Sequence, residues 1–184
     1  IFDREALLGV SITGWMNNPD ILFDEKVLKK GASIVKKINK EVAEILGINP
    51  AARTTCVKPS GNASVLLQTA SGIHAEHSPM YIRNVQMNKE SEITQAITRT
   101  NPFMVEDSVW SAGGTDVVVS FPIVPKRGSL FKDNLYGVKH LELVKKAQKA
   151  WVVAGTNEEL CADKGLHHNV SNTIIVDDWD EVEK

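Results

Sequence analysis

One run of residues has the composition of a phosphate-binding loop. The β-prone segment 54–58 breaks into a turn of small residues, and an apolar run follows at 65–67. Proline and glycine end the strand, and small side chains let a phosphate approach backbone N–H groups that are unpaired where a helix starts. No side-chain base is needed for such binding. The predicted phosphate-binding residues are Pro59, Ser60, Gly61, Asn62, Ala63 and Ser64.

Two other interpretations of this segment stay open. Ser-Gly-Asn between apolar runs is also typical of an ordinary turn from a strand to a helix. Lys58 either lends its positive charge to a bound phosphate or is a solvated lysine at the end of a strand. The chain contains neither the Gly-Lys-Ser/Thr ending of nucleotide triphosphatase loops nor the Gly-x-Gly-x-x-Gly pattern of dinucleotide sites.

The cysteines and histidines give weaker evidence of a functional site. Cys56 and Cys161 have no metal-type spacing, and we expect no disulfide between them. Because Cys56 ends an apolar strand, packing is its expected role. His74-x-x-His77 lacks a third ligand nearby, so no metal site is predicted. The histidine pair at 167–168 is expected at the surface.

Composition predicts a globular protein. Of the 184 residues, 42% are hydrophobic and 24% are charged, and the formal net charge of -2 gives no general attraction to DNA, RNA or anionic lipid. No apolar run approaches the roughly 20 residues that span a bilayer, and the start is not a secretory signal. We therefore expect a cytoplasmic protein without membrane or direct nucleic-acid partners. The opening on Ile1 and the final helix-like run indicate an excerpt from a longer polypeptide.

Apolar periodicity predicts the elements that must position the loop. The clearest helix covers 24–46, where apolar residues repeat at helical spacing, lysines fill the other face and Gly47 marks the end. Further helices are expected directly after the loop up to residue 70, at 90–99 and at 138–153. The expected strands are 9–14, 54–58, 81–86, 116–122 and 170–176.

This alternation predicts an α/β fold with a largely parallel sheet, and nothing in residues 1–184 marks an internal domain boundary. In such sheets ligands bind at the carboxyl ends of strands, which is where the turn 59–64 falls if 54–58 is a strand. The expected position and the expected chemistry of the turn therefore agree.

Three segments occur in an order that chance rarely produces. They are Cys56-Val57-Lys58-Pro59-Ser60-Gly61-Asn62-Ala63-Ser64, Ala70-Ser71-Gly72-Ile73-His74-Ala75 and Tyr81-Ile82-Arg83-Asn84-Val85. Together they resemble the adenosylcobalamin-dependent, class II ribonucleotide reductases, especially the monomeric ribonucleoside-triphosphate type. The segments 9–14, 119–122, 169–173 and 177–182 are similar to further parts of that family. By analogy, the chain is a part of a catalytic domain and forms the later half of a ten-stranded α/β barrel.

The resemblance implies synthesis of deoxyribonucleotides by reduction at the 2′ carbon, started by a cysteine thiyl radical that adenosylcobalamin generates. It implies a ribonucleoside triphosphate as substrate, thioredoxin or a similar dithiol as reductant, and residues 60–64 as contacts to the substrate phosphates. The family's radical cysteine lies in an Asn-Pro-Cys-Gly-Glu-like loop that this sequence lacks. No catalytic residue and no cobalamin contact is therefore assigned, and the chain alone is expected to be inactive.

Three alternatives to this function stay open. The chain is part of a reductase that uses diphosphates or a separate metal-containing radical subunit, it is a non-catalytic module that binds nucleotides or phosphate, or it is a purely structural α/β domain.

Overall fold

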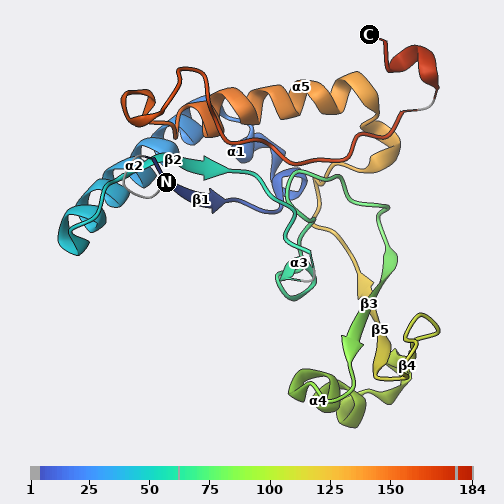
Figure 1. Ribbon diagram of the computed structural model, residues 1–184. Coiled ribbons are helices and arrows are strands. Elements are labelled where there is room, and N and C mark those ends of the chain that lie inside the picture. Colours follow the sequence, from blue (N-terminus) through green and yellow to red (C-terminus); the bar gives the residue numbers. More distant parts are fainter. Residues whose placement is uncertain (1–4, 62, 177, 184) are drawn as a thin grey trace.

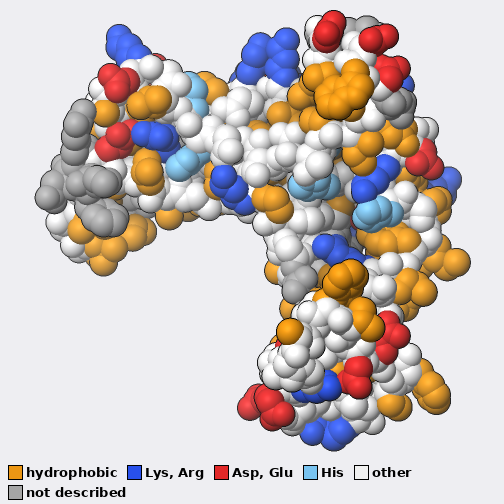
Figure 2. All heavy atoms as spheres, turned by 45° about the vertical axis from the view of Figure 1, so that its right-hand side comes forward, with side chains coloured by type: hydrophobic (Ala, Val, Ile, Leu, Met, Phe, Trp, Pro, Cys, Tyr) orange, Lys and Arg blue, Asp and Glu red, His pale blue; other side chains and the backbone are white. Residues whose placement is uncertain are grey.

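The computed structural model describes residues 5–61, 63–176 and 178–183, which form a mixed α/β fold in two parts (Figure 1). The body contains β1 (Ala6–Ser11), α1 (Pro19–Leu22), α2 (Glu25–Leu46), β2 (Ala51–Cys56), α3 (Ala63–Leu66) and α5 (Gly137–Ala147). The second part, called the lobe (residues 81–123), contains β3 (Tyr81–Asn88), α4 (Glu92–Thr100), β4 (Val105–Asp107) and β5 (Asp116–Ile123). The lobe extends away from the body, and the space-filling view in Figure 2 shows the two parts joined by a narrower neck.

Helix α2 confirms the helix predicted at 24–46. The Asp24 side chain accepts hydrogen bonds from the N–H groups of Lys26 and Val27, which caps the start, and Gly47 ends the helix with a φ of 67°. Only part of the apolar surface of α2 is buried, and a second apolar stripe is exposed. Among the described helices, none combines the length and the apolar character needed to cross a lipid bilayer.

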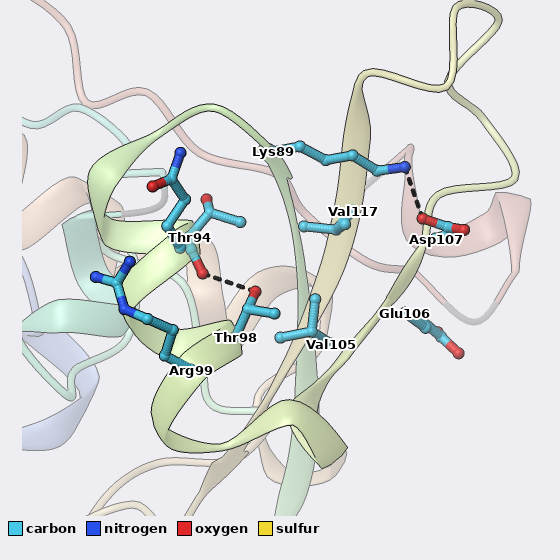
Figure 3. A pocket seen from close by; sticks show the side chains of 9 residues that line it. Lys89, Thr94, Thr98, Arg99, Val105, Glu106, Asp107 and Val117 are labelled. Carbon is cyan, nitrogen blue, oxygen red and sulfur yellow. Dashed lines mark hydrogen bonds and ion pairs between the residues drawn. The ribbon is translucent and has the colours of Figure 1, made fainter.

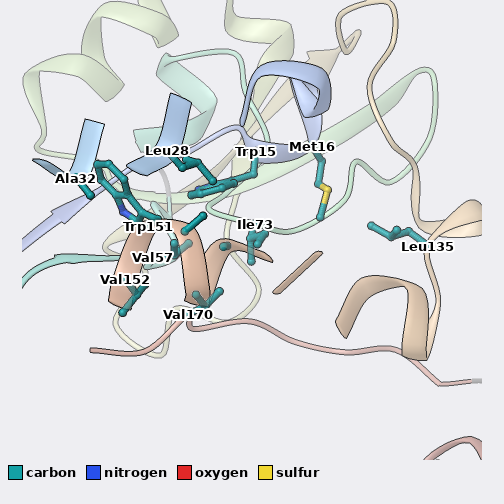
Figure 4. Packing of buried hydrophobic residues seen from close by; sticks show 12 residues of the cluster. Trp15, Met16, Leu28, Ala32, Val57, Ile73, Leu135, Trp151, Val152 and Val170 are labelled. Carbon is teal, nitrogen blue, oxygen red and sulfur yellow. The ribbon is translucent and has the colours of Figure 1, made fainter. Parts of the chain in front are cut away.

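The core lies between β2, α2 and the region that follows α5 (Figure 4). The predicted helix 138–153 is present as α5 followed by a π-helical stretch at Gln148–Val153. In this stretch, the Trp151 indole N–H donates to the Cys56 carbonyl at 3.0 Å, and the Thr55 hydroxyl donates to the Trp151 carbonyl at 2.6 Å. These contacts fix the carboxyl end of β2, from which the predicted loop starts.

The strands form two small sheets. β1 and β2 pair in parallel, whereas β3, β5 and β4 form an antiparallel sheet in that order. The pairing of β3 with β5 runs from Tyr81 opposite Ile123 to Asn88 opposite Asp116. Two consecutive strands can be parallel only if the chain crosses back to the starting end of the first strand. Here α4 lies at the far end of β3, so the chain returns along the sheet in the opposite direction. The prediction of a largely parallel sheet is therefore wrong for the lobe.

The strand predicted at 170–176 is also wrong. Val170 forms a single parallel bridge to Val57, in which the Val57 N–H donates to the Asn169 carbonyl at 3.2 Å and the Ser171 N–H donates to the Val57 carbonyl at 2.9 Å. Further along, the Ile175 carbonyl accepts from the Gly137 N–H at 2.9 Å, at the start of α5. The segment thus extends the β1–β2 sheet for one bridge and then follows α5.

Candidate phosphate-binding site

The predicted phosphate-binding residues lie where β2 ends and α3 begins. Val57 is buried, the chain turns away from the sheet after it, and Gly61 has a left-handed φ of 52°, a conformation that favours glycine. The short helix α3 buries Ser64 and Val65. Asn62 lies outside the described residues. The turn is therefore in the predicted place, at the carboxyl end of β2.

Three hydroxyl groups from separate segments meet at Ser60. Thr13 follows β1, and its Oγ1 lies 2.8 Å from the Ser60 Oγ. The Ser71 Oγ accepts a hydrogen bond from the Ser60 N–H at 2.9 Å. The Thr13 hydroxyl donates to the Ala70 carbonyl at 3.0 Å and accepts from the Gly72 N–H at 2.8 Å. Because the single Thr13 proton is used at Ala70, the Ser60 hydroxyl is the donor to Thr13. The loops after β1 and β2 and the segment 70–72 are thus tied together.

Gly72 packs directly behind the loop. Its φ of 56° is left-handed, and a Cβ at this position would lie 2.9 Å from the Lys58 carbonyl oxygen and 3.4 Å from the Pro59 Cα. A side chain would therefore strain the backbone at 72 and displace the start of the loop. Sequence reasoning did not find this constraint, because it depends on the approach of two distant segments.

The backbone N–H groups of the loop are less available than the sequence predicts. The Ser60 N–H donates to Ser71, and the N–H groups of Ala63 and Ser64 donate to the carbonyls of Ser60 and Gly61 over 3.2 and 3.3 Å. The prediction of unpaired N–H groups at these residues is wrong for this conformation, because the first turn of α3 closes on the loop itself. In the described part of the loop, 58–61 and 63–64, the Gly61 N–H is the donor without a hydrogen-bond partner.

Two cations lie near the loop. The Lys58 Nζ donates to the Asn169 Oδ1 at 2.6 Å, so this ammonium group is directed to the segment that follows residue 168. Arg83 on β3 approaches from the lobe, and its Nη2 donates to the Gly61 carbonyl at 3.4 Å. Arg83, Thr13 and Ser71 stand in segments that resemble the family, but no local signal in the sequence shows that they converge on the loop.

Both cysteines are free thiols. Cys56 is buried, and burial raises the pKa of its thiol, opposed by the nearby charge of Lys58. Burial also raises the pKa of the Cys161 thiol, against the lowering effect of the Arg53 guanidinium. A raised pKa reduces the fraction of reactive thiolate at neutral pH. These surroundings support the predicted packing role of Cys56.

Of the histidines singled out in the sequence, His74 and His168 bond to the protein backbone, whereas His77 and His167 bond to side chains. The His74 Nδ1 lies 2.8 Å from the Ser71 carbonyl and its Nε2 accepts from the Thr173 N–H at 3.1 Å, so the proton is on Nδ1. The His168 Nε2 lies 3.0 Å from the Leu8 carbonyl. Over the part of the chain that the structure describes, no three metal-ligating side chains come together.

Besides a cavity of about 360 Å³ around Val109 and Trp110, two cavities lie beside elements of the lobe. The first, about 580 Å³, is bounded by α4 and β4; Arg99 lies on its α4 side, opposite an ion pair of 2.7 Å between Lys89 and Asp107 (Figure 3). The second, about 260 Å³, is apolar and lies between α3 and the lobe sheet. Of the predicted phosphate-binding residues that are described, Ala63 lines the second cavity and none lines the first.

Known proteins resemble this chain in sequence, although no family profile matches it. A Dictyostelium discoideum protein described as a probable adenosylcobalamin-dependent ribonucleoside-triphosphate reductase is 28% identical over 121 residues, which cover 66% of this chain and 16% of that protein. An adenosylcobalamin-dependent ribonucleoside-triphosphate reductase of Euglena gracilis is 23% identical over 172 residues, or 90% of this chain and 23% of that enzyme. The Lactobacillus acidophilus enzyme of the same name is 25% identical over 124 residues, which cover 61% of this chain and 16% of that enzyme.

A solved structure resembles the fold. The crystal structure of a B12-dependent, class II ribonucleotide reductase superposes with a TM-score of 0.53 at 18% identity, over 69% of this chain and 18% of that one. The chain thus spans between 16% and 23% of the length of the proteins that it matches. The resemblance to the adenosylcobalamin-dependent, class II ribonucleotide reductases that the sequence indicates is therefore confirmed, and this chain is related to one part of these enzymes.

Proposed function

We propose that this chain is the substrate-phosphate-binding part of an adenosylcobalamin-dependent ribonucleoside-triphosphate reductase. In this proposal, residues 59–64 hold the phosphates of the ribonucleotide, and the fold is the later half of a ten-stranded α/β barrel. The observation that carries the proposal is the meeting of Thr13, Ser60 and Ser71. Three sequence segments that resemble the family thereby converge on one loop.

The chemistry of the loop suits a phosphate chain. Ser60 and Ser64 carry hydroxyl groups, which in this conformation donate to Thr13 and to the Gly61 carbonyl. Gly61 leaves open space, because a Cβ there would have no described atom within 4 Å apart from its chain neighbours. The N–H bonds of Ala63 and Ser64, at 3.2 and 3.3 Å, are at the long limit for hydrogen bonds and are weak. A small rotation of the loop would exchange them for shorter, charge-assisted bonds to phosphate oxygens.

The proposed reaction replaces the 2′-hydroxyl of the ribonucleotide by hydrogen. Two electrons come from a dithiol such as thioredoxin, which becomes a disulfide, and the hydroxyl leaves as water. The role of this chain is to bind and orient the substrate through its phosphates, which fixes the ribose relative to the reacting groups.

The described residues do not fit the cofactor. The apolar cavity beside α3 holds about 260 Å³, below the usual range for drug-sized ligands, and a corrin ring is larger still. The cavity in the lobe carries charged side chains of both signs. No described residue is therefore assigned to adenosylcobalamin.

The test of the proposal is conversion of CTP to dCTP by the complete polypeptide that carries this chain, with a dithiol and with or without adenosylcobalamin. We expect dCTP that depends on the cofactor. Product from CDP, or only with an added radical-generating subunit, would place the protein in another reductase class. Nucleotide binding without any reduction would instead favour a non-catalytic module.

The Ser60→Ala variant tests the loop. We expect the KM for CTP to rise about tenfold, as the loss of one hydrogen bond to a charged group implies. Ser33→Ala, which removes an exposed hydroxyl from α2, is the control and should keep the wild-type KM. An unchanged KM in Ser60→Ala, with normal thermal stability, would remove the loop from the substrate site. Residues 1–184 alone are expected not to reduce CTP, because the family's radical-cysteine motif is missing from them.

A further inference from the structure

The strand β3 faces α3 and the proposed phosphate loop across an apolar cavity. Side chains alternate along a strand, so Arg83, Val85 and Met87 share one face of β3. Val85 is buried, and both Val85 and Met87 line the apolar cavity opposite Ala63 and Leu66 of α3. Arg83 lies on the same face as these residues, next to the loop, where its Nη2 reaches the Gly61 carbonyl.

The guanidinium of Arg83 has donors to spare at this position. It makes one long hydrogen bond, 3.4 Å from its Nη2 to the Gly61 carbonyl, and that carbonyl already accepts the Ser64 hydroxyl at 2.6 Å. A guanidinium has five N–H donors in one plane. Within the described part of the chain, no carboxylate forms an ion pair with Arg83. Among the described residues, its charge therefore has no direct carboxylate partner.

The other cation near the loop is directed toward a different segment. The Lys58 ammonium donates to Asn169 at 2.6 Å, and the whole chain has a formal net charge of -2. A triphosphate carries several negative charges, which require local cations, and arginine pairs with phosphate through two parallel hydrogen bonds. Arg83 is the cation whose guanidinium reaches Gly61 of the loop.

We infer that Arg83 is a further substrate-binding residue, whose guanidinium contacts the phosphate chain of the ribonucleotide held at residues 59–64. This inference rests on the proposed function. On binding, the guanidinium exchanges its long bond to the Gly61 carbonyl for charge-assisted bonds to phosphate oxygens. The lobe thereby contributes to the substrate site.

The experiment compares Arg83→Gln and Arg83→Lys with Arg99→Gln in the complete polypeptide. Arg99 is a matched control, because it is an exposed arginine of the same lobe that lines the cavity at α4 and not the loop. The KM for CTP, equilibrium binding of CTP at low and high salt, and the thermal midpoint are measured for each protein.

We expect Arg83→Gln to raise the KM and the Kd for CTP about ten- to hundredfold, with kcat within about twofold of wild type. The salt dependence of CTP binding should become shallower, because one cation–phosphate contact is lost. Arg83→Lys should recover part of the affinity, because it keeps the charge and loses the planar fork. Arg99→Gln should match the wild type.

Three outcomes would overturn the assignment. They are an unchanged affinity in Arg83→Gln, an equal loss in Arg99→Gln, and a loss of kcat and thermal stability at unchanged affinity. The last would mean that Arg83 only supports the loop through Gly61. Failure of the proposed function is distinguishable, since a wild-type protein that neither binds nor reduces CTP overturns both proposals together.

Discussion

At the scale of a single residue, the left-handed backbone conformation of Gly72 allows its close contact with the start of the proposed phosphate loop. We expect Gly72→Ala to lower the free energy of unfolding by about 1–3 kcal/mol, because alanine is strained at a left-handed φ. It should also raise the KM for CTP, because the new Cβ would lie 2.9 Å from the Lys58 carbonyl and displace the loop.

Gly165→Ala separates these two effects. Gly165 also has a left-handed φ, 79°, but a Cβ there would meet no atom within 4 Å. This variant should lose stability from backbone strain and keep the wild-type KM. Chemical denaturation and steady-state kinetics measure both quantities, and equal KM values for the two variants would contradict the steric connection between Gly72 and the loop.

We expect His140 to make the stability of the protein depend on pH. It is 4% exposed, and its Nε2 lies 3.0 Å from the Ile73 carbonyl. Burial lowers the pKa of this imidazole, the hydrogen bond to Ile73 opposes that shift, and the nearby His74 lowers the pKa further. In the folded state the pKa is thus below the unfolded value of about 6.5, and the unfolded chain binds more protons.

The contribution of His140 to stability is therefore complete above about pH 6.5 and is lost as the pH falls through the folded-state pKa. We expect urea unfolding to show decreasing stability from neutral to mildly acidic pH. His140→Gln should flatten this dependence. An equal slope in the variant and the wild type would assign the acid sensitivity to other groups.

At the scale of elements, Glu76 holds the lobe where it leaves the body. Its buried carboxylate accepts hydrogen bonds from the Asn17 Nδ2 at 2.6 Å and from the Tyr81 hydroxyl at 2.7 Å. Its backbone N–H donates to the Leu130 carbonyl at 3.0 Å, and its carbonyl accepts from the Lys132 N–H at 2.9 Å. Since Tyr81 starts β3 and residues 130–132 follow β5, Glu76 contacts the chain on both sides of the lobe.

Tyr81→Phe tests this connection. Removing the hydroxyl leaves a buried carboxylate with one donor fewer, so we expect a loss of about 1–3 kcal/mol in the free energy of unfolding. Limited proteolysis should cut the neck segments 76–80 and 124–130 faster in the variant. A loss below about 0.5 kcal/mol, the range of neutral surface substitutions, would show that Glu76 does not stabilise the junction.

Elements with strong local signals were predictable from the sequence. A capping aspartate, helical periodicity and a terminal glycine define α2, and the predictions at 81–86, 90–99 and 116–122 each fall on an element of the lobe. The direction of strand pairing was not predictable, because the same alternation of side chains suits a parallel or an antiparallel neighbour. The apolar run 170–176 has the pattern of a strand, yet its only bridge in the described structure joins Val170 to Val57.

The candidate site was predictable only where it is continuous in sequence. The turn after β2 carries its own signal in Pro59 and Gly61. Thr13 and Arg83 reach the loop from positions 47 and 22 residues away, through contacts that no local pattern encodes. The N–H groups of Ala63 and Ser64 donate to carbonyls of the same loop, and the sequence does not show this either, because it depends on the conformation of the first turn of α3.

At the scale of the whole molecule, a large apolar surface lies on the outside of the body. On α2 the exposed large apolar residues follow helical spacing, adjacent to the buried face; they are Val27, Ile34, Ile38, Val42, Ile45 and Leu46. Leu7 and Leu8 of β1 are also exposed, and among the described strands β1 pairs with β2 alone. Contiguous apolar patches and open strand edges of this kind favour association.

We therefore expect residues 1–184, produced alone, to self-associate with rising concentration and to bind a hydrophobic dye. Burying a large apolar side chain contributes about 1.5–3 kcal/mol, so a few of these residues suffice to drive association. The double variant Ile38→Lys and Ile45→Lys should shift sedimentation toward the monomer, because it places charge in the centre of the α2 stripe. Ser33→Lys adds charge to the same helix at a polar, exposed position and should leave association unchanged. A dye-free monomer at every concentration, or an equal effect of the control, would mean that the α2 stripe is not an association surface.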